Sequence, residues 1–470
     1  MRKCTVGIRD LATVKTWGGG MPAALQTSVN VACSMSPPPG PPRRPFLGNL
    51  VEFGRNPLTF FARCAEEYGD VVSLKIGGWP ALFLNHPDHF ENVLLTNNRN
   101  FIKHTFFWRH VTGIFGRGLL TSEGGPWLRQ RRLMQPAFHR DRIAGYGATM
   151  VAYTERMLDS WTGDGSERRD VHDDLMKLTM EIATKTLFGA DLPPVEAAEV
   201  SAAFSDAIVE IANRFRRPFK IPPWLPIPSN RRYQRAIARL DRLIYGFIDQ
   251  KKREGTGDDL LSMLMEVRDE DGTGMDTKQI RDEAVTIFLA GHETTAIMLS
   301  WTLYLLSQNP AVEERLVREI QSTSDVTCLP YLANVVNESM RLFPPAYAFG
   351  RESLEECSIG GYLIPAGTTI FMSPWVIHRD PRWFTDPLEF RPERWDGDFA
   401  KTLPRFAYLP FGGGPRICIG NNFALMEAML VLASMLRRYR LTLAPGARID
   451  PFPSITLRPR YGMPMIVSRR

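Results

Sequence analysis

A glycine-rich stretch surrounds a single cysteine near the C-terminal end of the chain. It runs Phe411-Gly-Gly-Gly-Pro-Arg416-Ile-Cys418-Ile-Gly420, which fits the pattern F-x-x-G-x-R-x-C-x-G. Glycines let the backbone approach the sulfur closely, so that N–H groups can donate hydrogen bonds to it. The apolar run that follows, 423–436, predicts a helix whose positive end favours an anionic sulfur. Such a thiolate can serve as an axial ligand of iron.

The plainer interpretation is a glycine-rich turn beside a buried structural cysteine, the commoner environment of a free cysteine. Five residue types fixed over ten positions, however, put a chance match in this chain below about 10⁻⁴. The pattern resembles the heme-binding loop of the cytochrome P450 family. The resemblance implies that Cys418 ligates the iron of heme b (iron protoporphyrin IX) and that Phe411, Gly412 and Gly420 bind the cofactor.

A second group of reactive residues is the segment Ala290-Gly291-His292-Glu293-Thr294-Thr295. A glycine beside two threonines allows a kink that opens a helical turn to bound dioxygen and water. Splitting the O–O bond requires two protons, which a positioned acid and alcohol can deliver. The segment resembles the family's oxygen-activation motif, which implies Thr294 as the alcohol and Glu293 as the acid. The alternative is a packing threonine beside a solvated glutamate, and we assign His292 no catalytic role.

Glu338 and Arg341 form an E-x-x-R pair at helical spacing. Alone this signal is weak, because such pairs are common on exposed helix faces and contribute little. Here Leu-Phe-Pro-Pro follows, and Pro392-Glu-Arg394-Trp lies further on. The combination resembles the family's buried Glu–Arg–Arg cluster. This implies that Arg341 and Arg394 both hydrogen-bond Glu338, in a structural role needed for heme incorporation rather than turnover.

Trp127 and Arg131 are four residues apart, which places an indole and a guanidinium on one helix face. The resemblance assigns both to a heme propionate, together with Arg351 and Arg416. The alternative is a surface tryptophan with basic neighbours. Further arginines could line a basic face for an acidic electron donor, namely Arg129, Arg132 and the arginines from Arg437 to Arg440.

The segments that match the family's substrate contacts are mainly apolar, which predicts a hydrophobic ligand. Aromatic residues at such positions are equally often part of the core. The residues expected in the pocket are Phe107, Phe288, Ala290, Ala346, Tyr347 and Ile455.

The elements that must position these residues are mainly helical. One long helix is expected over 277–308, ending at Asn309-Pro310. Hairpins are expected from 71–76 with 81–84 and from 362–364 with 368–372. The fold class is therefore mainly α with small β-sheets, and the resemblance implies the cytochrome P450 fold, with a long central helix over a buried heme.

Composition fits a large globular protein: 470 residues, 44% hydrophobic and 23% charged. The net charge of +6 is too small to indicate that the protein binds nucleic acid. The chain contains no run of 18 or more apolar residues, so the sequence does not predict a membrane anchor. Six cysteines without paired spacing fit a reducing compartment, so we expect a cytoplasmic protein. Residues 1–36 are expected to be a disordered extension or a misassigned start, before a single heme-thiolate domain over 37–470.

These features together predict a heme-thiolate monooxygenase that inserts one oxygen atom from O₂ into a fatty acid, terpenoid or similar substrate. The electrons would come from a ferredoxin- or flavodoxin-type donor with its reductase, and we expect a monomer. A peroxide-driven peroxygenase is the first alternative, although it would not need Glu293 and Thr294. A non-catalytic protein that binds heme or a hydrophobic ligand is the second.

Overall fold

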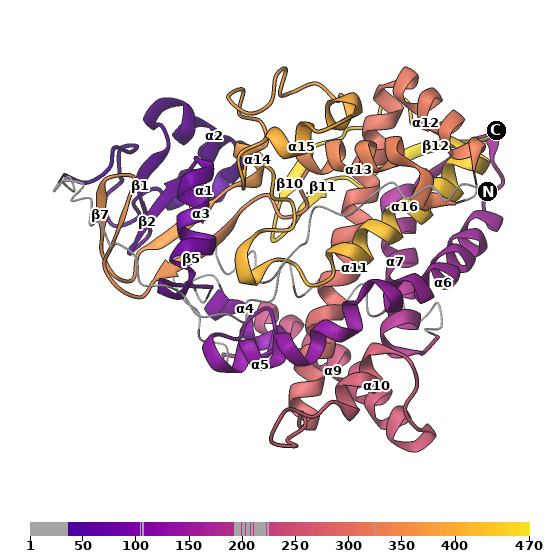
Figure 1. Ribbon diagram of the computed structural model, residues 1–470, viewed down its shortest axis with the longest axis horizontal. Helices are drawn as coiled ribbons and strands as arrows, with labels where there is room; N and C mark the ends of the chain where they lie inside the picture. The colour runs from indigo at the N-terminus through magenta and orange to yellow at the C-terminus, as the bar shows by residue number, and fades with distance from the viewer. Residues whose placement is uncertain are drawn as a thin grey trace, which may run out of the picture.

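The computed structural model describes residues 36–103, 105, 108–191, 225–323 and 325–470, with isolated positions 199, 203, 207, 210 and 222. Within these residues, one sheet and several short helices lie at one end of the molecule, and the long helices lie at the other together with a smaller sheet near the C-terminus (Figure 1). The predicted mainly α fold with small sheets is confirmed. The predicted N-terminal extension lies outside the described residues, apart from residue 36.

The α-helices carry most of the described chain. They are α1 (Leu50–Arg55), α2 (Pro57–Tyr68), α3 (Pro87–Glu91), α4 (Trp108–Phe115), α5 (Gly124–Met134), α6 (Arg140–Asp159), α7 (Val171–Phe188), α9 (Pro228–Glu254), α10 (Leu260–Glu266), α11 (Thr277–Gln308), α12 (Pro310–Ser322), α13 (Pro330–Leu342), α14 (Pro374–Ile377), α15 (Phe399–Thr402) and α16 (Asn421–Arg438).

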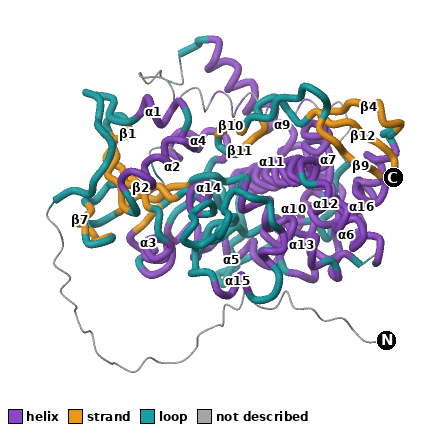
Figure 2. Tube along the Cα trace, turned by 90° about the horizontal axis from the view of Figure 1, so that it is seen from above, coloured by secondary structure: helices purple, strands orange, loops and turns teal. Residues whose placement is uncertain are grey.

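Helix α11 is the centre of this arrangement, and other helices surround it in Figure 2. It covers the range that the sequence predicts, Thr277–Gln308. Its start is fixed by Asp276, whose side chain accepts a hydrogen bond from the N–H of Gln279 at 2.7 Å. Its 32 residues span about 48 Å. It is helical throughout, and α7 runs beside it.

The strands form small sheets. They are β1 (Val71–Ile76), β2 (Trp79–Leu84), β3 (Phe101–Ile102), β4 (Asp164–Asp170), β5 (Phe349–Ser353), β6 (Cys357–Ile359), β7 (Tyr362–Ile364), β8 (Thr369–Met372), β9 (Tyr439–Leu443), β10 (Pro451–Pro453), β11 (Leu457–Pro459) and β12 (Pro464–Arg469). One sheet has the order β1-β2-β8-β5-β3, a second β4-β12-β9, and β6–β7 and β10–β11 are separate pairs.

The first expected hairpin is confirmed, with Ile76 paired to Trp79. The second is wrong, because β7 pairs with β6 whereas β8 pairs with β2 and β5. The tight turn is Gly360-Gly361, where both residues have positive φ (58° and 81°), as a two-residue hairpin turn requires. The Pro-Ala-Gly segment after β7 instead carries the chain into the larger sheet.

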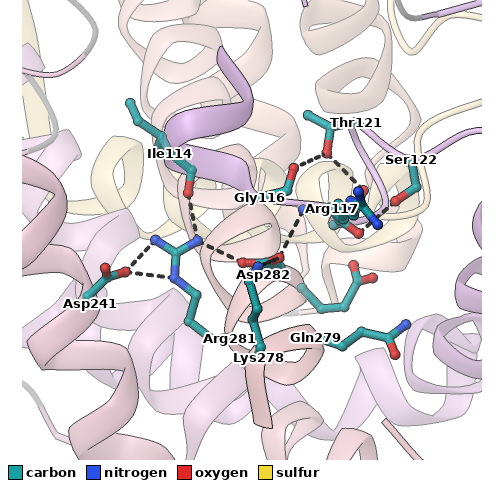
Figure 3. Close-up of polar contacts among 12 residues, drawn as sticks. Ile114, Gly116, Arg117, Thr121, Ser122, Asp241, Lys278, Gln279, Arg281 and Asp282 are labelled. Atoms are coloured by element: carbon teal, nitrogen blue, oxygen red, sulfur yellow. Dashed lines mark hydrogen bonds and ion pairs between the residues drawn. The ribbon is translucent and has the colours of Figure 1, made fainter. Parts of the chain in front are cut away.

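The start of α11 is tied to two other segments through Arg281, as Figure 3 shows. The guanidinium donates to Asp241 of α9 at 2.7 Å and to the carbonyl of Ile114 at 2.8 Å. It also contacts Asp282 at 2.9 Å. Only 7% of the Arg281 side chain is exposed, so these bonds lie largely outside solvent.

The next two residues of α11 hold the loop that follows α4. Asp282 accepts a hydrogen bond from the N–H of Arg117 at 2.9 Å, and Glu283 accepts one from the N–H of Leu119 at 2.8 Å. Gly116 has a φ of +56°, and a Cβ there would lie 2.1 Å from the Asp282 carboxyl group. The loop is therefore fitted closely to α11.

We expect Arg281→Ala to lower the free energy of unfolding by about 3–5 kcal/mol, because it leaves Asp241 and Asp282 without their buried partner. Lys278→Ala is the matched control: Lys278 contacts the same Asp282 at 2.9 Å, but its side chain is 71% exposed. Its loss should cost less than about 1 kcal/mol. Urea denaturation of the full-length protein measures the free energy of unfolding of both variants. Equal losses of stability would show that the Arg281 contacts stabilise the fold no more than the exposed Lys278 contact.

Candidate functional site

The loop around Cys418 is shaped by glycines in left-handed conformations. Gly412 has a φ of +72°, and Gly414 has a φ of +66°. A Cβ on Gly414 would lie 1.8 Å from the carbonyl oxygen of Leu94, so no other residue fits there. The N–H of Cys418 donates to the carbonyl of Phe411 at 3.0 Å, which closes the loop on itself.

The sulfur of Cys418 has favourable partners for a thiolate. Its side chain is solvent-accessible, and α16 begins shortly after it, at Asn421. The surrounding protein raises the pKa of the thiol, while the Gly420 N–H and the cations Arg131 and Lys103 act in the opposite direction. These donors and charges suit an anionic sulfur bound to a metal.

Three cations converge beside this loop with too little negative charge. Burial and the nearby Arg351 and Arg416 lower the pKa of Lys103 to about 7. Burial and Arg416 lower the pKa of Arg351 to about 10. Among the described residues, Glu123 is the carboxylate that opposes both shifts. Because buried charges are normally paired, this cluster fits a further anionic group such as the heme propionates.

The residues predicted to bind the propionates lie together at the loop. Arg131 of α5 donates to the carbonyl of Ile417 at 2.9 Å. Arg416 forms an ion pair with Glu123 and lies 4.3 Å from the ring centre of Trp127. The structure thus joins α5 to the Cys418 loop through side chains that the sequence assigns to the cofactor.

One turn in the middle of α11 is accessible. From Ile280 to Leu303 every residue is buried except Ala290, Gly291 and Thr294. These three residues lie on one helix face, since they are spaced i, i+1 and i+4. The Thr294 hydroxyl donates to the carbonyl of Ala290 at 2.7 Å. We call these three residues the accessible turn.

Glu293 does not share that turn. It is buried, and Arg458 and Thr456 both donate to its carboxylate. Burial pushes the pKa of Glu293 upward, but the Arg458 guanidinium and the Thr456 hydroxyl outweigh burial and hold the pKa below its usual value. In this arrangement Glu293 is an ionised carboxylate paired with Arg458, whereas the Thr294 hydroxyl bonds to Ala290.

Phe288, expected in the substrate pocket, is placed in the core instead. It is 1% exposed, and its ring lies 5.7 Å from that of Phe188 on α7 and 5.4 Å from that of His292. The reason is helical geometry: two residues before Ala290, a side chain points to nearly the opposite side of the helix.

The remaining pocket predictions are placed differently from one another. Tyr347 is buried, and its hydroxyl donates to the carbonyl of Ser454 at 2.9 Å. Ala346 is exposed, and Ile455 packs against the apolar cluster of α4, α5, α7, α9 and α11. Phe107 lies outside the described residues.

Glu338 of α13 is the acceptor of a buried cluster of donors. Arg341 donates to both carboxylate oxygens at 2.9 Å, and Arg394 donates at 3.3 Å. The N–H of Arg391 (3.0 Å) and the indole of Trp395 (2.9 Å) complete the set. The side chains of Glu338 and Arg341 are wholly buried, so the carboxylate and the guanidinium depend on each other.

Most arginines of the expected basic face form ion pairs within the molecule. Ion pairs and carbonyl oxygens hold its arginines: Arg129 with Asp269, Arg132 with Glu270, Arg437 with the carbonyls of Ile320 and Thr323, Arg438 with Glu155 and Asp159, and Arg440 with Glu313. These arginines therefore offer an electron donor less positive charge than their number suggests.

Sequence reasoning missed several residues of the site. Lys103 and Glu123 carry no motif, although Glu123 immediately precedes the helix of Trp127. Arg458, the partner of Glu293, lies 165 positions away from it in the chain. Trp395 was visible, as the residue directly after Arg394, but only its indole geometry shows that it contacts Glu338.

We expect Glu338→Ala to accumulate mainly as heme-free protein, because two largely buried guanidinium groups lose their acceptor, at a cost of about 3–5 kcal/mol. Heme per polypeptide measures this. The control is Glu270→Ala, since the Glu270 side chain is 92% exposed and, among the described residues, pairs with the exposed Arg132. Normal heme content in Glu338→Ala would contradict the structural role.

Comparisons with known proteins agree with this geometry. The chain is 37% identical over 426 residues to cyclooctatin synthase of Streptomyces melanosporofaciens, covering 88% of this chain and 92% of that protein. It is 36% identical over 415 residues to cyclooctat-9-en-7-ol 5-monooxygenase of the same organism (86% and 89% covered). It is 33% identical over 416 residues to pentalenene oxygenase of Streptomyces avermitilis (87% and 92%). Since the family model for cytochrome P450 also matches residues 38–463, the chain belongs to the cytochrome P450 family and is a monooxygenase.

Proposed function

We propose that this monooxygenase binds heme b through Cys418 and inserts one oxygen atom from O₂ into a cyclic terpenoid. The observation that carries the proposal is the accessible turn, Ala290, Gly291 and Thr294, in an otherwise buried stretch of α11. It offers one hydroxyl among small residues, which leaves room for dioxygen and an apolar ligand.

Heme bound at Cys418 supplies the oxygen activation, and the chain supplies orientation and protons. Arg131, Arg351 and Arg416 hold the propionates in this proposal. Thr294 is the proton-donating alcohol, because its hydroxyl is the polar side-chain group of the accessible turn. Glu293, now ion-paired with Arg458, supplies protons by way of water once it leaves that partner.

Two relatives support the substrate class. By their names, one oxidises cyclooctat-9-en-7-ol and another pentalenene, both cyclic alkenes.

We further propose a ferredoxin- or flavodoxin-type electron donor with its reductase, a monomeric enzyme and a cytoplasmic location. Among the described residues, no helix has the length and apolar character needed to cross a bilayer.

The direct test is to titrate the heme-loaded protein with cyclic terpenoids, fatty acids, steroids and macrolides while recording the heme Soret band. We expect a saturable low-to-high-spin shift with cyclic terpenoids. A shift with fatty acids alone would overturn the substrate class. The absence of a thiolate-heme spectrum would overturn the assignment of Cys418.

We expect Thr294→Ala to lower product formation with O₂ and reductant by about 10²-fold, because it removes the positioned proton donor. Turnover driven by hydrogen peroxide should change little, since peroxide brings its own protons. Thr294→Ser keeps the hydroxyl and is the matched control. An equal loss in both assays would argue against proton delivery, and an unchanged O₂-driven rate would favour a different donor.

A further inference from the structure

His378 is a fully buried histidine to which the sequence motifs assign no role. It directly follows α14 and is 0% exposed. Its ring nitrogen Nε2 lies 2.9 Å from the backbone nitrogen of Leu409, a residue that is itself buried. A backbone N–H can only donate, so Nε2 is the acceptor and carries no proton. The imidazole in this contact is therefore neutral, with its proton on Nδ1.

Leu409 begins the turn that leads into the Cys418 loop. Its carbonyl accepts a hydrogen bond from the N–H of Gly412 at 3.0 Å, which closes a four-residue turn with a glycine in the favoured fourth position. The carbonyl of Phe411, the third residue of this turn, accepts a hydrogen bond from the N–H of Cys418 at 3.0 Å. The backbone of Cys418 is therefore bonded to a turn whose first N–H donates to His378.

The backbone of His378 is fixed by the buried cluster around Glu338. Its carbonyl accepts a hydrogen bond from Nη1 of Arg341 at 2.8 Å, and its N–H donates to the carbonyl of Pro374 at 3.0 Å. Arg341 in turn donates to both carboxylate oxygens of Glu338. His378 thus joins two parts of the site, because its main chain contacts the Glu338 cluster and its side chain contacts the turn before Cys418.

We propose that His378 is a positioning residue for the iron ligand: its neutral imidazole accepts the Leu409 N–H and so fixes the turn that orients Cys418. This inference rests on the proposed binding of heme by Cys418. It assigns His378 no contact with cofactor or substrate, because its effect passes through residues 409–412. Without this acceptor the buried Leu409 N–H loses its hydrogen bond, and the turn must shift to find another.

The surroundings of His378 favour the neutral imidazole. Among the described residues, the charged groups that face it are the guanidinium groups of Arg341 and Arg379, and the Tyr408 ring lies 5.0 Å from the imidazole. Burial and the two guanidinium groups hold the pKa of His378 well below its usual range, while the carbonyls of Arg341 and Met340 act in the opposite direction. A further positive charge is unfavourable here, so the ring remains an acceptor at neutral pH.

The ligation of the heme iron provides the first readout. When carbon monoxide is bound to the reduced, heme-loaded protein, the Soret band differs between a thiolate and a neutral thiol ligand, so the rate of thiolate loss can be followed at one temperature. We expect His378→Leu, which removes the acceptor, to lose the thiolate about tenfold faster than the wild type. His378→Gln should stay within about twofold of the wild-type rate, because its amide oxygen can accept the Leu409 N–H.

Tyr408→Phe is the matched control. The Tyr408 hydroxyl donates to the carbonyl of Asn337 at 2.9 Å, so this variant removes a hydrogen bond beside the same imidazole and keeps the Leu409 contact. Urea denaturation of the heme-loaded proteins measures the stability that each variant loses. Even where that loss matches the loss in His378→Leu, Tyr408→Phe should lose the thiolate within about twofold of the wild-type rate.

Stability at different pH gives a second readout, which does not depend on the ligand of the iron. The folded-state pKa of His378 lies below the ordinary value of 6.5, so the unfolded chain binds a proton that the folded protein does not. Relative to His378→Gln, the wild type should therefore lose stability as the pH falls below about 6.5. A stability difference that stays constant from about pH 7.5 to about pH 5.5 would mean that folded His378 binds this proton equally well, which contradicts the neutral acceptor.

Each result bears on a separate claim. Equal acceleration of thiolate loss in Tyr408→Phe and His378→Leu would reduce His378 to a packing residue, and a His378→Gln protein as fast as His378→Leu would overturn the acceptor role. If His378→Leu fails to fold, His378→Phe keeps a ring against Tyr408 and still lacks the acceptor. A wild type without thiolate-ligated heme would refute the role of Cys418, whereas the pH dependence of stability still tests the neutral imidazole.

Discussion

A single long helix that carries polar residues through the core is the constraint on which this structure depends. Helix α11 is buried from Ile280 to Leu303 except at one turn, yet it contains several ionisable side chains in that span. Each needs a partner, since an unpaired buried charge costs several kcal/mol. The partners come from distant segments: Asp241 of α9 for Arg281, and Arg458 for Glu293. The need to pair the buried polar side chains of α11 therefore draws distant segments of the chain against this helix.

The same requirement explains the two sides of the site. On the Cys418 side, Lys103, Arg351 and Arg416 hold an excess of positive charge that a dianionic cofactor would balance. On the α11 side the small residues Ala290 and Gly291 leave one turn open, and Thr294 provides its hydroxyl. Positive charge thus lies where propionates belong, and apolar surface with one alcohol lies where substrate and dioxygen belong.

Buried carboxyl groups have two contrasting fates in this protein. Glu338 accepts hydrogen bonds from two guanidinium groups, an amide and an indole. Among the described residues the Oε1 of Glu427 has no hydrogen-bond partner, and burial raises the pKa of Glu427 to about 8. The number of hydrogen-bond donors around each group, rather than burial alone, distinguishes these two carboxyl groups.

The sequence by itself determined the features that depend on neighbouring residues. The range of α11, the shared helix face of Trp127 and Arg131, the pairing of Glu338 with Arg341 and the glycine turn around Cys418 all follow from local periodicity, capping and backbone freedom. Motif resemblance added the expectation that Arg394 would reach Glu338, and the hydrogen bond is present at 3.3 Å.

Only the tertiary structure decided which side chains meet across long separations. The Phe288 side chain lies in the core because successive helix positions differ by about 100° in direction, so that it points nearly opposite to Ala290 two positions later. The tertiary structure also paired Glu293 with Arg458, placed Lys103 among the arginines, and joined β7 to β6 rather than β8. The physical reason is that ion pairs, buried charges and strand partners depend on distances through space, which neither spacing nor composition specifies.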